Sequence, residues 1–150
     1  MTELNIDRIM ESIQQASGSP CEPYTGIKND LTIRIQPEQL TTAIDVLRDE
    51  FDCVHLTGIT AQQREEQEDL IEVMYHFWHG CGVSLMMKLP SSDPELPSII
   101  QALPGADFYE REVAEMFGVH YTGRDETPPL LLPDEWDQGP AFMQKEDTDG

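Results

Sequence analysis

Two segments of alternating apolar and polar residues, 71–77 and 83–89, place the strongest constraint on the fold of this chain. The first has Ile, Val, Tyr and Phe at every second position, and the second has Val, Leu, Met and Leu at the same spacing. Side chains of a strand point alternately to its two faces, so each segment predicts a strand that is buried on one face. Gly80-Cys81-Gly82 separates the two segments and supplies a turn. The pair is therefore predicted to form an antiparallel β-hairpin.

The residues on either side of the hairpin carry helical and strand patterns. Apolar residues recur at i, i+3, i+4 and i+7 within 6–13 and again within 40–51, which predicts two amphipathic helices. The first should end at the breaker cluster 17–20, and Pro37 suits the first turn of the second. The remaining segments before residue 107 are predicted as strands at 31–35 and 53–59, loops at 62–69 and 90–97, and a short helix at 96–103.

The order helix–strand–helix–strand–strand–strand–helix predicts an α+β domain, with a mostly antiparallel four-stranded sheet and helices packed on one face. We assign residues 1–120 to this domain. From Tyr121 onward the chain is rich in proline and acids and has no periodicity, although Leu130-Leu131-Leu132, Trp136 and Phe142 are apolar. Residues 121–150 are therefore expected to form an irregular, Pro-rich acidic docking tail that lies along its own domain or along a partner.

The charge of the chain excludes several classes of function. The 150 residues include 9 Lys and Arg against 29 Asp and Glu, which gives a formal net charge of −20. Binding to nucleic acid, or to a membrane through a polybasic patch, needs clusters of basic side chains, so neither is expected. No stretch approaches the roughly 20 apolar residues of a membrane span, and the N-terminus lacks a basic-then-apolar signal. An acidic cytoplasmic protein without a membrane span is expected.

The three cysteines, Cys21, Cys53 and Cys81, are predicted to be reduced thiols in or near the core. Their odd number does not suit a disulfide framework. Their wide spacing does not suit an iron–sulfur site, whose ligands normally cluster within a few residues.

Residues 107–117 predict a short amphipathic helix whose apolar face comprises Tyr109, Val113, Met116 and Phe117. Arg111 lies four residues from both Asp107 and Glu115, so two ion pairs along the helix are expected. Gly118 should end the helix, because glycine readily takes positive φ. Taken alone, these features are those of a salt-bridged surface helix that closes a domain.

This helix and the residues after it resemble the signature of the 30 kDa subunit family of respiratory complex I, the C subunit of NADH:quinone oxidoreductase. The family pattern runs Glu-Arg-Glu, an acid, two bulky apolar residues, a His or Lys, a Pro or basic residue and two aliphatic residues at fixed spacings. The matching residues here are Glu110, Arg111, Glu112, Glu115, Met116, Phe117, Arg124, Pro128, Leu130 and Leu131. Arg124 departs from the His or Lys of the family but keeps the positive charge. Beyond the signature, Leu132-Pro133-Asp134-Glu135-Trp136 and Gly139-Pro140 are similar to a further stretch of the family.

The resemblance implies an accessory, cofactor-free structural subunit on the hydrophilic arm of a complex I-like energy-converting oxidoreductase. Its implied partners are a large catalytic subunit, either 49 kDa-like or a hydrogenase large subunit, and iron–sulfur subunits that carry the clusters. The implied place is peripheral, on the cytoplasmic side of the membrane, where the subunit supports electron transfer coupled to ion translocation.

The type of parent complex stays open. The same family includes subunits of membrane-bound [NiFe] hydrogenases, formate hydrogenlyases and F420H2 dehydrogenases. After Pro140 the chain departs from the Leu-Arg-Lys-Asp that is usual in complex I members. Both the NADH:quinone type and the hydrogenase or F420H2 dehydrogenase type therefore remain possible.

The docking hypothesis assigns no catalytic, cofactor-binding or metal-binding residue to this chain. Arg111 is expected to make charge-assisted bonds within the domain or across an interface. Trp136, together with residues 130–132, is expected to anchor the tail on the partner as a hot spot.

Two alternatives belong to other classes of function. One is a free-standing acidic adaptor that binds a basic partner through its charge. The other is a small metal-binding enzyme that uses His76, His79 and Cys81 as zinc-type ligands, with His55 or His120 as a further ligand.

Overall fold

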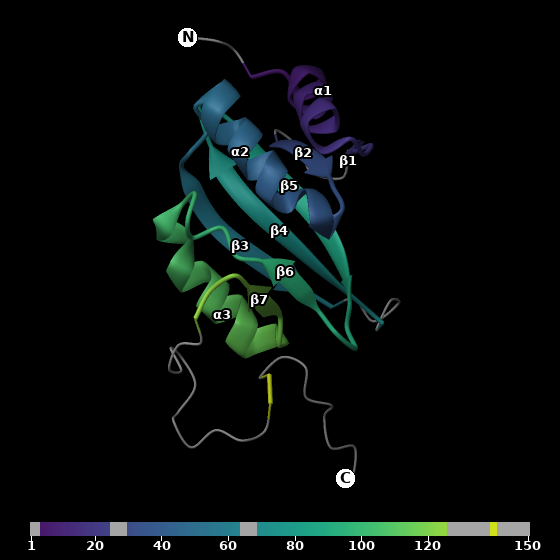
Figure 1. Ribbon diagram of the computed structural model, residues 1–150, viewed down its shortest axis with the longest axis vertical. Coiled ribbons are helices and arrows are strands. Elements are labelled where there is room, and N and C mark those ends of the chain that lie inside the picture. Colours follow the sequence, from purple (N-terminus) through teal and green to yellow (C-terminus); the bar gives the residue numbers. More distant parts are fainter. Residues whose placement is uncertain (1–3, 25–29, 64–68, 126–138, 141–150) are drawn as a thin grey trace.

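The computed structural model describes residues 4–24, 30–63, 69–125 and 139–140 of the chain (Figure 1). The predicted helices at 6–13, 40–51 and 107–117, and the predicted strands at 31–35, 53–59, 71–77 and 83–89, each have a counterpart. In chain order the elements are α1 (Ile6–Ser17), β1 (Glu22–Tyr24), β2 (Asp30–Arg34), η1 (Pro37–Gln39), α2 (Leu40–Phe51), β3 (Leu56–Gln62), β4 (Leu70–Trp78), β5 (Gly82–Pro90), β6 (Glu95–Pro97), η3 (Pro104–Ala106), α3 (Asp107–Phe117) and β7 (His120–Thr122).

Five of the strands form one sheet in the order β1-β2-β5-β4-β3. β4 and β5 pair antiparallel from Leu70 opposite Pro90 to Trp78 opposite Gly82, which confirms the predicted hairpin. β3 joins β4 antiparallel, whereas β2 joins β5 in parallel. The predicted α+β fold with a mostly antiparallel sheet is confirmed. The sheet is mixed and has one strand more than the four predicted, because β1 pairs with the outer edge of β2.

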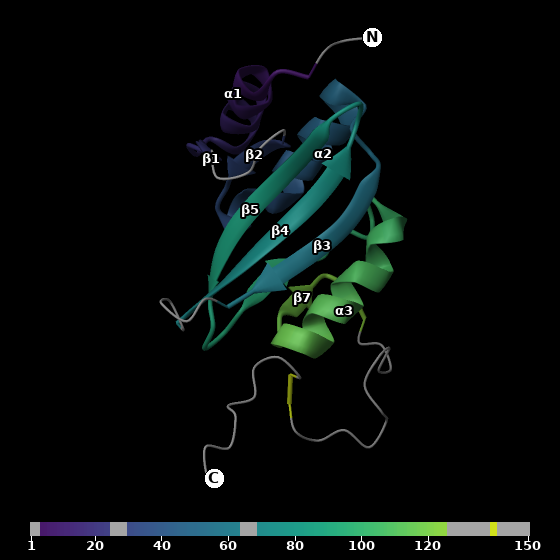
Figure 2. The same cartoon turned by 180° about the vertical axis from the view of Figure 1, so that it is seen from behind.

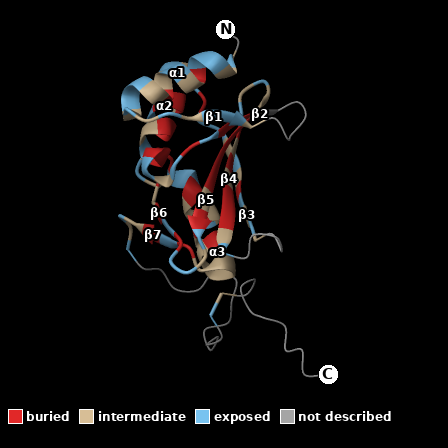
Figure 3. Cartoon of the chain, turned by 90° about the vertical axis from the view of Figure 1, so that its right-hand side faces the viewer, coloured by how far each residue is buried: buried red, intermediate tan, exposed pale blue. Residues whose placement is uncertain are grey.

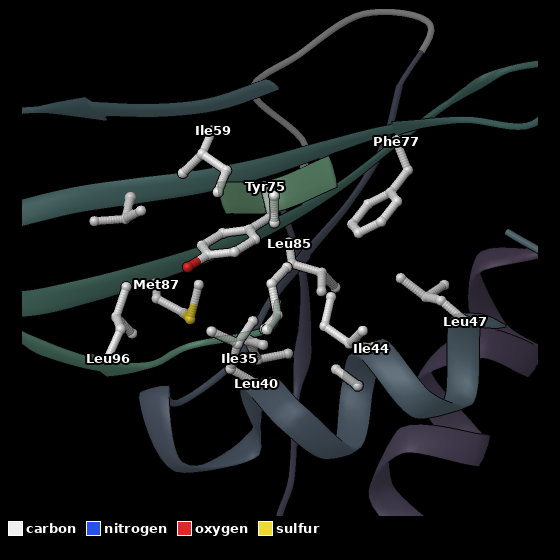
Figure 4. Close-up of a cluster of buried hydrophobic side chains, with 14 of the residues drawn as sticks. Ile35, Leu40, Ile44, Leu47, Ile59, Tyr75, Phe77, Leu85, Met87 and Leu96 are labelled. Atoms are coloured by element: carbon white, nitrogen blue, oxygen red, sulfur yellow. The ribbon is translucent and has the colours of Figure 1, made fainter. Parts of the chain in front are cut away.

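The core lies between this sheet and the helices α1 and α2, which cover one of its faces. Figure 3 shows the buried residues concentrated there, and Figure 2 shows β3, β4 and β5 from the opposite side, with α2 behind them. Alternate residues of the hairpin supply the centre of the core and are each at most 2% exposed: Ile71, Val73, Tyr75, Phe77, Val83, Leu85, Met87 and Leu89. Leu40, Ile44 and Leu47 of α2 pack against them (Figure 4). The period-two pattern therefore identifies the residues that face the helices correctly, although Glu72, Ser84 and Met86 on the opposite face are buried as well.

The ends of the helices follow from local hydrogen bonding. Asn5 caps α1, since its side-chain oxygen accepts from the backbone N–H of Asp7 at 2.9 Å. Gly18 ends α1 with φ of 71°, within the predicted breaker cluster. Pro37 begins η1, the short 3-10 turn that leads into α2, which agrees with its predicted place in a first turn.

The predicted short helix at 96–103 is wrong. Its apolar residues have helical spacing, but they form a single turn, in which the Leu103 N–H donates to the Ile99 carbonyl at 2.8 Å. The residues before that turn form β6, which pairs in parallel with β7 and lies within the predicted loop at 90–97. This pairing sets Leu96 beside Tyr121, and both are buried. A contact with a strand so distant along the chain overrides the local helical pattern.

β7 spans the boundary at residue 120 that separates the predicted domain from the predicted tail, and the continuous described chain extends to Asp125. Within the described ranges, none of the helices has both the length and the apolar character that crossing a membrane requires.

Candidate functional site

Glu110, the first residue of the Glu-Arg-Glu signature, is completely buried on α3. Its carboxylate accepts a hydrogen bond from the Ser98 hydroxyl at 2.6 Å and one from the Ile99 backbone N–H at 2.7 Å. The Arg124 guanidinium donates to it at 3.0 Å. A buried carboxylate is tolerated only when its oxygens are paired in this way. Glu110 therefore ties α3 both to the turn after β6 and to the chain that follows β7.

Arg124 supplies the opposite charge and is itself almost buried, with 9% of its side chain exposed. Its two terminal nitrogens reach different carboxylates, Glu110 and Asp107, which lie one turn apart on α3. Burial alone would lower the pKa of Arg124, but the hydrogen bonds to Asp107 and Glu110 outweigh it and hold that pKa above its ordinary value. We refer to Ser98, Ile99, Asp107, Glu110 and Arg124 as the Glu110 cluster.

Two buried phenols adjoin the Glu110 cluster. The hydroxyl of Tyr75 on β4 donates to that of Tyr121 on β7 at 3.5 Å. Burial raises the pKa of Tyr75 well above its ordinary value, and nearby Tyr121 and Glu110 raise it further. The pKa of Tyr121 is also raised, mainly by burial and with a smaller contribution from the charge of Glu110. Both phenols are therefore neutral at physiological pH and act as buried polar contacts.

The other signature residues of α3 lie nearer the surface. Arg111 is 21% exposed and pairs with Asp107 at 3.9 Å, the predicted i,i+4 contact within the domain. Glu112 is exposed, and Glu115 is half-buried. On the predicted apolar face Val113 is buried, whereas Tyr109, Met116 and Phe117 are half-buried.

Glu110 differs most from its prediction. The sequence pattern groups it with the surface charges of a docking helix, whereas the structure buries it in the domain. Its position carries a signal, because it shares helical spacing with buried Ala106 and Val113 and with half-buried Phe117. An acid at such a position indicates a buried partner, and that partner is Arg124, fourteen residues further along the chain.

Gly118 ends α3 as predicted. It takes φ of 75°, and its N–H donates to the Ala114 carbonyl at 2.9 Å. The signature and tail residues Pro128, Leu130, Leu131, Pro133 and Trp136 lie outside the described residues.

The predicted metal ligands do not come together as a site. Both ring nitrogens of His76 bond to hydroxyls, Nδ1 to Ser84 and Nε2 to Thr60, each at 2.9 Å. Across the part of the chain that the structure describes, no three His, Cys, Asp or Glu side chains are grouped so that they could hold a metal ion. His79 donates from its backbone N–H to the Cys81 carbonyl at 3.0 Å, which is a turn contact.

The cysteines are all free thiols, in agreement with the prediction. Cys53 is buried, and burial, reinforced by nearby Cys81 and Asp52, raises the pKa of its thiol to about 11. Cys21 and Cys81 are half-buried.

Known proteins resemble this chain over most of its length. The family model described as "Respiratory-chain NADH dehydrogenase, 30 Kd subunit" matches residues 33–147. The C subunit of NADH-quinone oxidoreductase from Herpetosiphon aurantiacus is 30% identical over 112 residues, which cover 71% of this chain and 66% of that protein. The C subunit from a Nocardioides species is 30% identical over 129 residues, which cover 80% of this chain and 49% of that protein. The chain thus aligns with about half to two thirds of the length of these curated relatives.

Two solved structures share the fold. One belongs to the membrane-bound sulfane sulfur reductase, an archaeal respiratory membrane complex, with a TM-score of 0.69, 20% identity, and coverage of 86% of this chain and 77% of that one. The other is the trypsin-resistant fragment (1-134) of Nqo5, with a TM-score of 0.62 and 23% identity. The match covers 81% of this chain and 98% of that fragment. At these identities the likeness establishes the fold alone. Since the family model spans most of the residues, including all of α3 and its signature, the chain belongs to the respiratory-chain NADH dehydrogenase 30 kDa subunit family.

Proposed function

We propose that this chain is an accessory, cofactor-free subunit of a complex I-like energy-converting oxidoreductase. The observation that carries the proposal is the family match over residues 33–147, together with curated relatives that are named as the C subunit of NADH-quinone oxidoreductase. The proposed place is peripheral, on the cytoplasmic side of the membrane. There the chain docks onto the large catalytic subunit, beside iron–sulfur subunits that hold the clusters, and supports electron transfer coupled to ion translocation.

The chemistry of α3 supports a structural rather than a catalytic role. Glu110 and Arg124 neutralise each other in the interior, and this pairing leaves neither group placed to exchange protons with a substrate. The outward side of α3 instead carries Phe108, which is 52% exposed, and the exposed Glu112. An exposed aromatic side chain beside a charge suits an interface.

The C-terminal segment is the second part of the proposed docking surface. Leu130, Leu131, Leu132 and Trp136 are large apolar residues in a segment that is otherwise acidic and rich in proline. Tryptophan is enriched among residues that dominate binding energy at interfaces. We assign Trp136 the role of anchor on the large catalytic subunit.

Affinity purification from native membranes tests this function. The chain carries an N-terminal tag, the membranes are extracted with a mild detergent, and the recovered proteins are identified by mass spectrometry. We expect a large catalytic subunit, iron–sulfur subunits and antiporter-like membrane subunits. Nickel in the catalytic subunit would identify the hydrogenase type, and its absence would favour a quinone or F420H2 dehydrogenase type. Recovery of the chain alone, as a soluble monomer, would refute the proposal and favour the acidic adaptor.

Two variants refine the test of the tail. A chain that ends after Asp125 keeps β7 and the Glu110 cluster but removes Trp136, and it should lose the partners. Trp136→Ala should weaken recovery in the same direction. Trp78→Ala is the matched control, because Trp78 is the other tryptophan and is 56% exposed at the end of β4. Full recovery of partners with the shortened chain would show that the tail is not the anchor.

A further inference from the structure

α3 contacts the C-terminal part of the chain at two separate places. Near its start, Asp107 and Glu110 bind Arg124. At its end, Gly118 lies directly against Pro140. Residues 126–138, which connect these two contacts, lie outside the described residues, so only the points where the chain enters and leaves them bear on the inference.

The contact at Gly118 is close enough to exclude any side chain. A Cβ atom built on Gly118 would lie 2.6 Å from Cγ of Pro140 and 3.5 Å from its Cβ. Pro140 is itself half-buried, whereas the preceding Gly139 is exposed. Figure 1 shows the short described segment 139–140 just beyond the end of α3 and β7. The proline ring therefore packs on the bare backbone at the end of the helix.

Gly18 shows that a helix-ending glycine does not require such a contact. It ends α1 with φ of 71° and donates to the Gln14 carbonyl at 2.9 Å, as Gly118 donates to Ala114 at the same distance. A Cβ on Gly18 would have nothing within 4 Å. The two glycines thus share the same backbone role, and Gly118 has an additional one as the surface for Pro140.

We propose that α3 holds the C-terminal segment at both ends, with Glu110 fixing Arg124 and Gly118 receiving Pro140. The proposal rests on the docking function of that segment. It makes Glu110, Arg124 and Gly118 positioning residues, which act through the segment and not through their own contact with a partner. Holding Arg124 and Pro140 in place before docking lowers the entropic cost of binding. The group that occupies the C-terminal end of α3, at Gly118, is therefore Pro140 of the same chain.

The first test measures the internal contact in the full-length chain, without any partner. In two-dimensional NMR, the α-protons of Gly118 should give nuclear Overhauser cross-peaks to the ring protons of Pro140. Absence of these cross-peaks from an assigned spectrum would overturn the proposal.

The second test compares matched substitutions by urea unfolding. Gly118→Ala and Gly18→Ala place the same strain on a positive φ, but only the first also displaces Pro140. Gly118→Ala should lower the folding equilibrium constant at least about threefold more than Gly18→Ala, because contacting residues couple. In a Pro140→Gly chain this excess should vanish, while the effect of Gly18→Ala stays unchanged. Equal effects of the two alanines in the unaltered chain would contradict the proposal.

Copurification separates this inference from the function on which it rests. We expect Gly118→Ala to lower the yield of partner subunits several-fold, and Gly18→Ala to leave the yield unchanged. If the chain ending after Asp125 loses its partners but Gly118→Ala keeps them all, the tail docks without the contact at Gly118, and the proposal fails alone. If the shortened chain also keeps its partners, the docking role of the tail fails and takes the proposal with it.

Discussion

Replacing Glu110 with glutamine removes one negative charge from the interior and keeps the shape of the side chain. The carboxylate serves three donors, with Oε1 accepting from Ser98 and Arg124 and Oε2 accepting from Ile99. A glutamine has only one acceptor oxygen. In one orientation the NH2 group of the glutamine faces Arg124 and Ser98. In the other orientation the NH2 group faces the Ile99 N–H. At least one buried donor loses its acceptor in either orientation.

The size of the effect follows from that loss. An unpaired buried donor costs about 1–3 kcal/mol, and removing one partner of a buried ion pair costs about 3–5 kcal/mol. Asp107 still pairs with Arg124 after the substitution. We therefore expect the free energy of unfolding to fall by about 3 kcal/mol, the lower limit for breaking a buried ion pair. For a chain of this size, that corresponds to a fall in Tm of roughly 6–12 °C.

Urea unfolding monitored by circular dichroism measures this difference. Glu112→Gln is the control, because it removes the same charge from an exposed position of the same helix. Exposed substitutions of this kind usually change stability by less than about 0.5 kcal/mol. A Glu110→Gln chain that unfolds at the same urea concentration as the Glu112→Gln chain would refute the reasoning that the Glu110 cluster stabilises the fold.

Three further outcomes are expected. In urea unfolding, Arg124→Lys should lower the free energy of unfolding by about 1 kcal/mol, because lysine keeps the positive charge but has a single nitrogen for the two carboxylates. Arg124→Met should lower it by about 3 kcal/mol, because methionine leaves the buried Glu110 without its opposite charge. The contribution of Cys53 to stability should be constant up to about pH 9 and be lost as pH rises toward 11. Burial raises the pKa of the Cys53 thiol from 9.0 to about 11 in the folded state, so the folded state keeps this proton at a higher pH than the unfolded state does. In a Cys53→Ala chain the free energy of unfolding should fall less steeply between about pH 9 and pH 11. An equally steep fall in both chains would contradict this role of Cys53. Added Zn²⁺ should leave Tm unchanged, since both ring nitrogens of His76 already bond to hydroxyls. An increase in Tm with added Zn²⁺ would indicate that the folded chain binds the metal.

The sequence predicts the parts of the fold whose signals are local. The hairpin of β4 and β5 is long enough for period-two alternation to identify both strands and the residues that face the helices. α1 and α2 each run for 12 residues, long enough for an apolar stripe to show. β1, β6 and β7 are three residues each, too short for alternation to distinguish them from loop.

The rest depends on contacts between distant residues. The parallel pairing of β2 with β5 joins segments about fifty residues apart, and no feature of either strand specifies the direction of its neighbour. For the candidate site, the resemblance selects Glu110 and Arg124 as important positions but does not specify that they bind each other. The contact of Asp107 with Arg124 and the roles of Ser98 and Tyr121 escape prediction, because each is an ordinary residue type whose contact arises only when distant elements meet.

The parallel pairing of β2 also bears on how a shortened chain would behave. β2 pairs with the first part of β5, from Gly82 to Met86, and β4 pairs with the other edge of β5 along its whole length. A chain begun at residue 33, where the family match starts, would lack three of the five residues of β2 and leave the backbone N–H and C=O groups of β5 opposite them, at residues 82–84, without those partners. An unpaired stretch of strand edge is a template for strands of other molecules. The residues before position 33 therefore close a part of the sheet edge that would otherwise be open to such pairing.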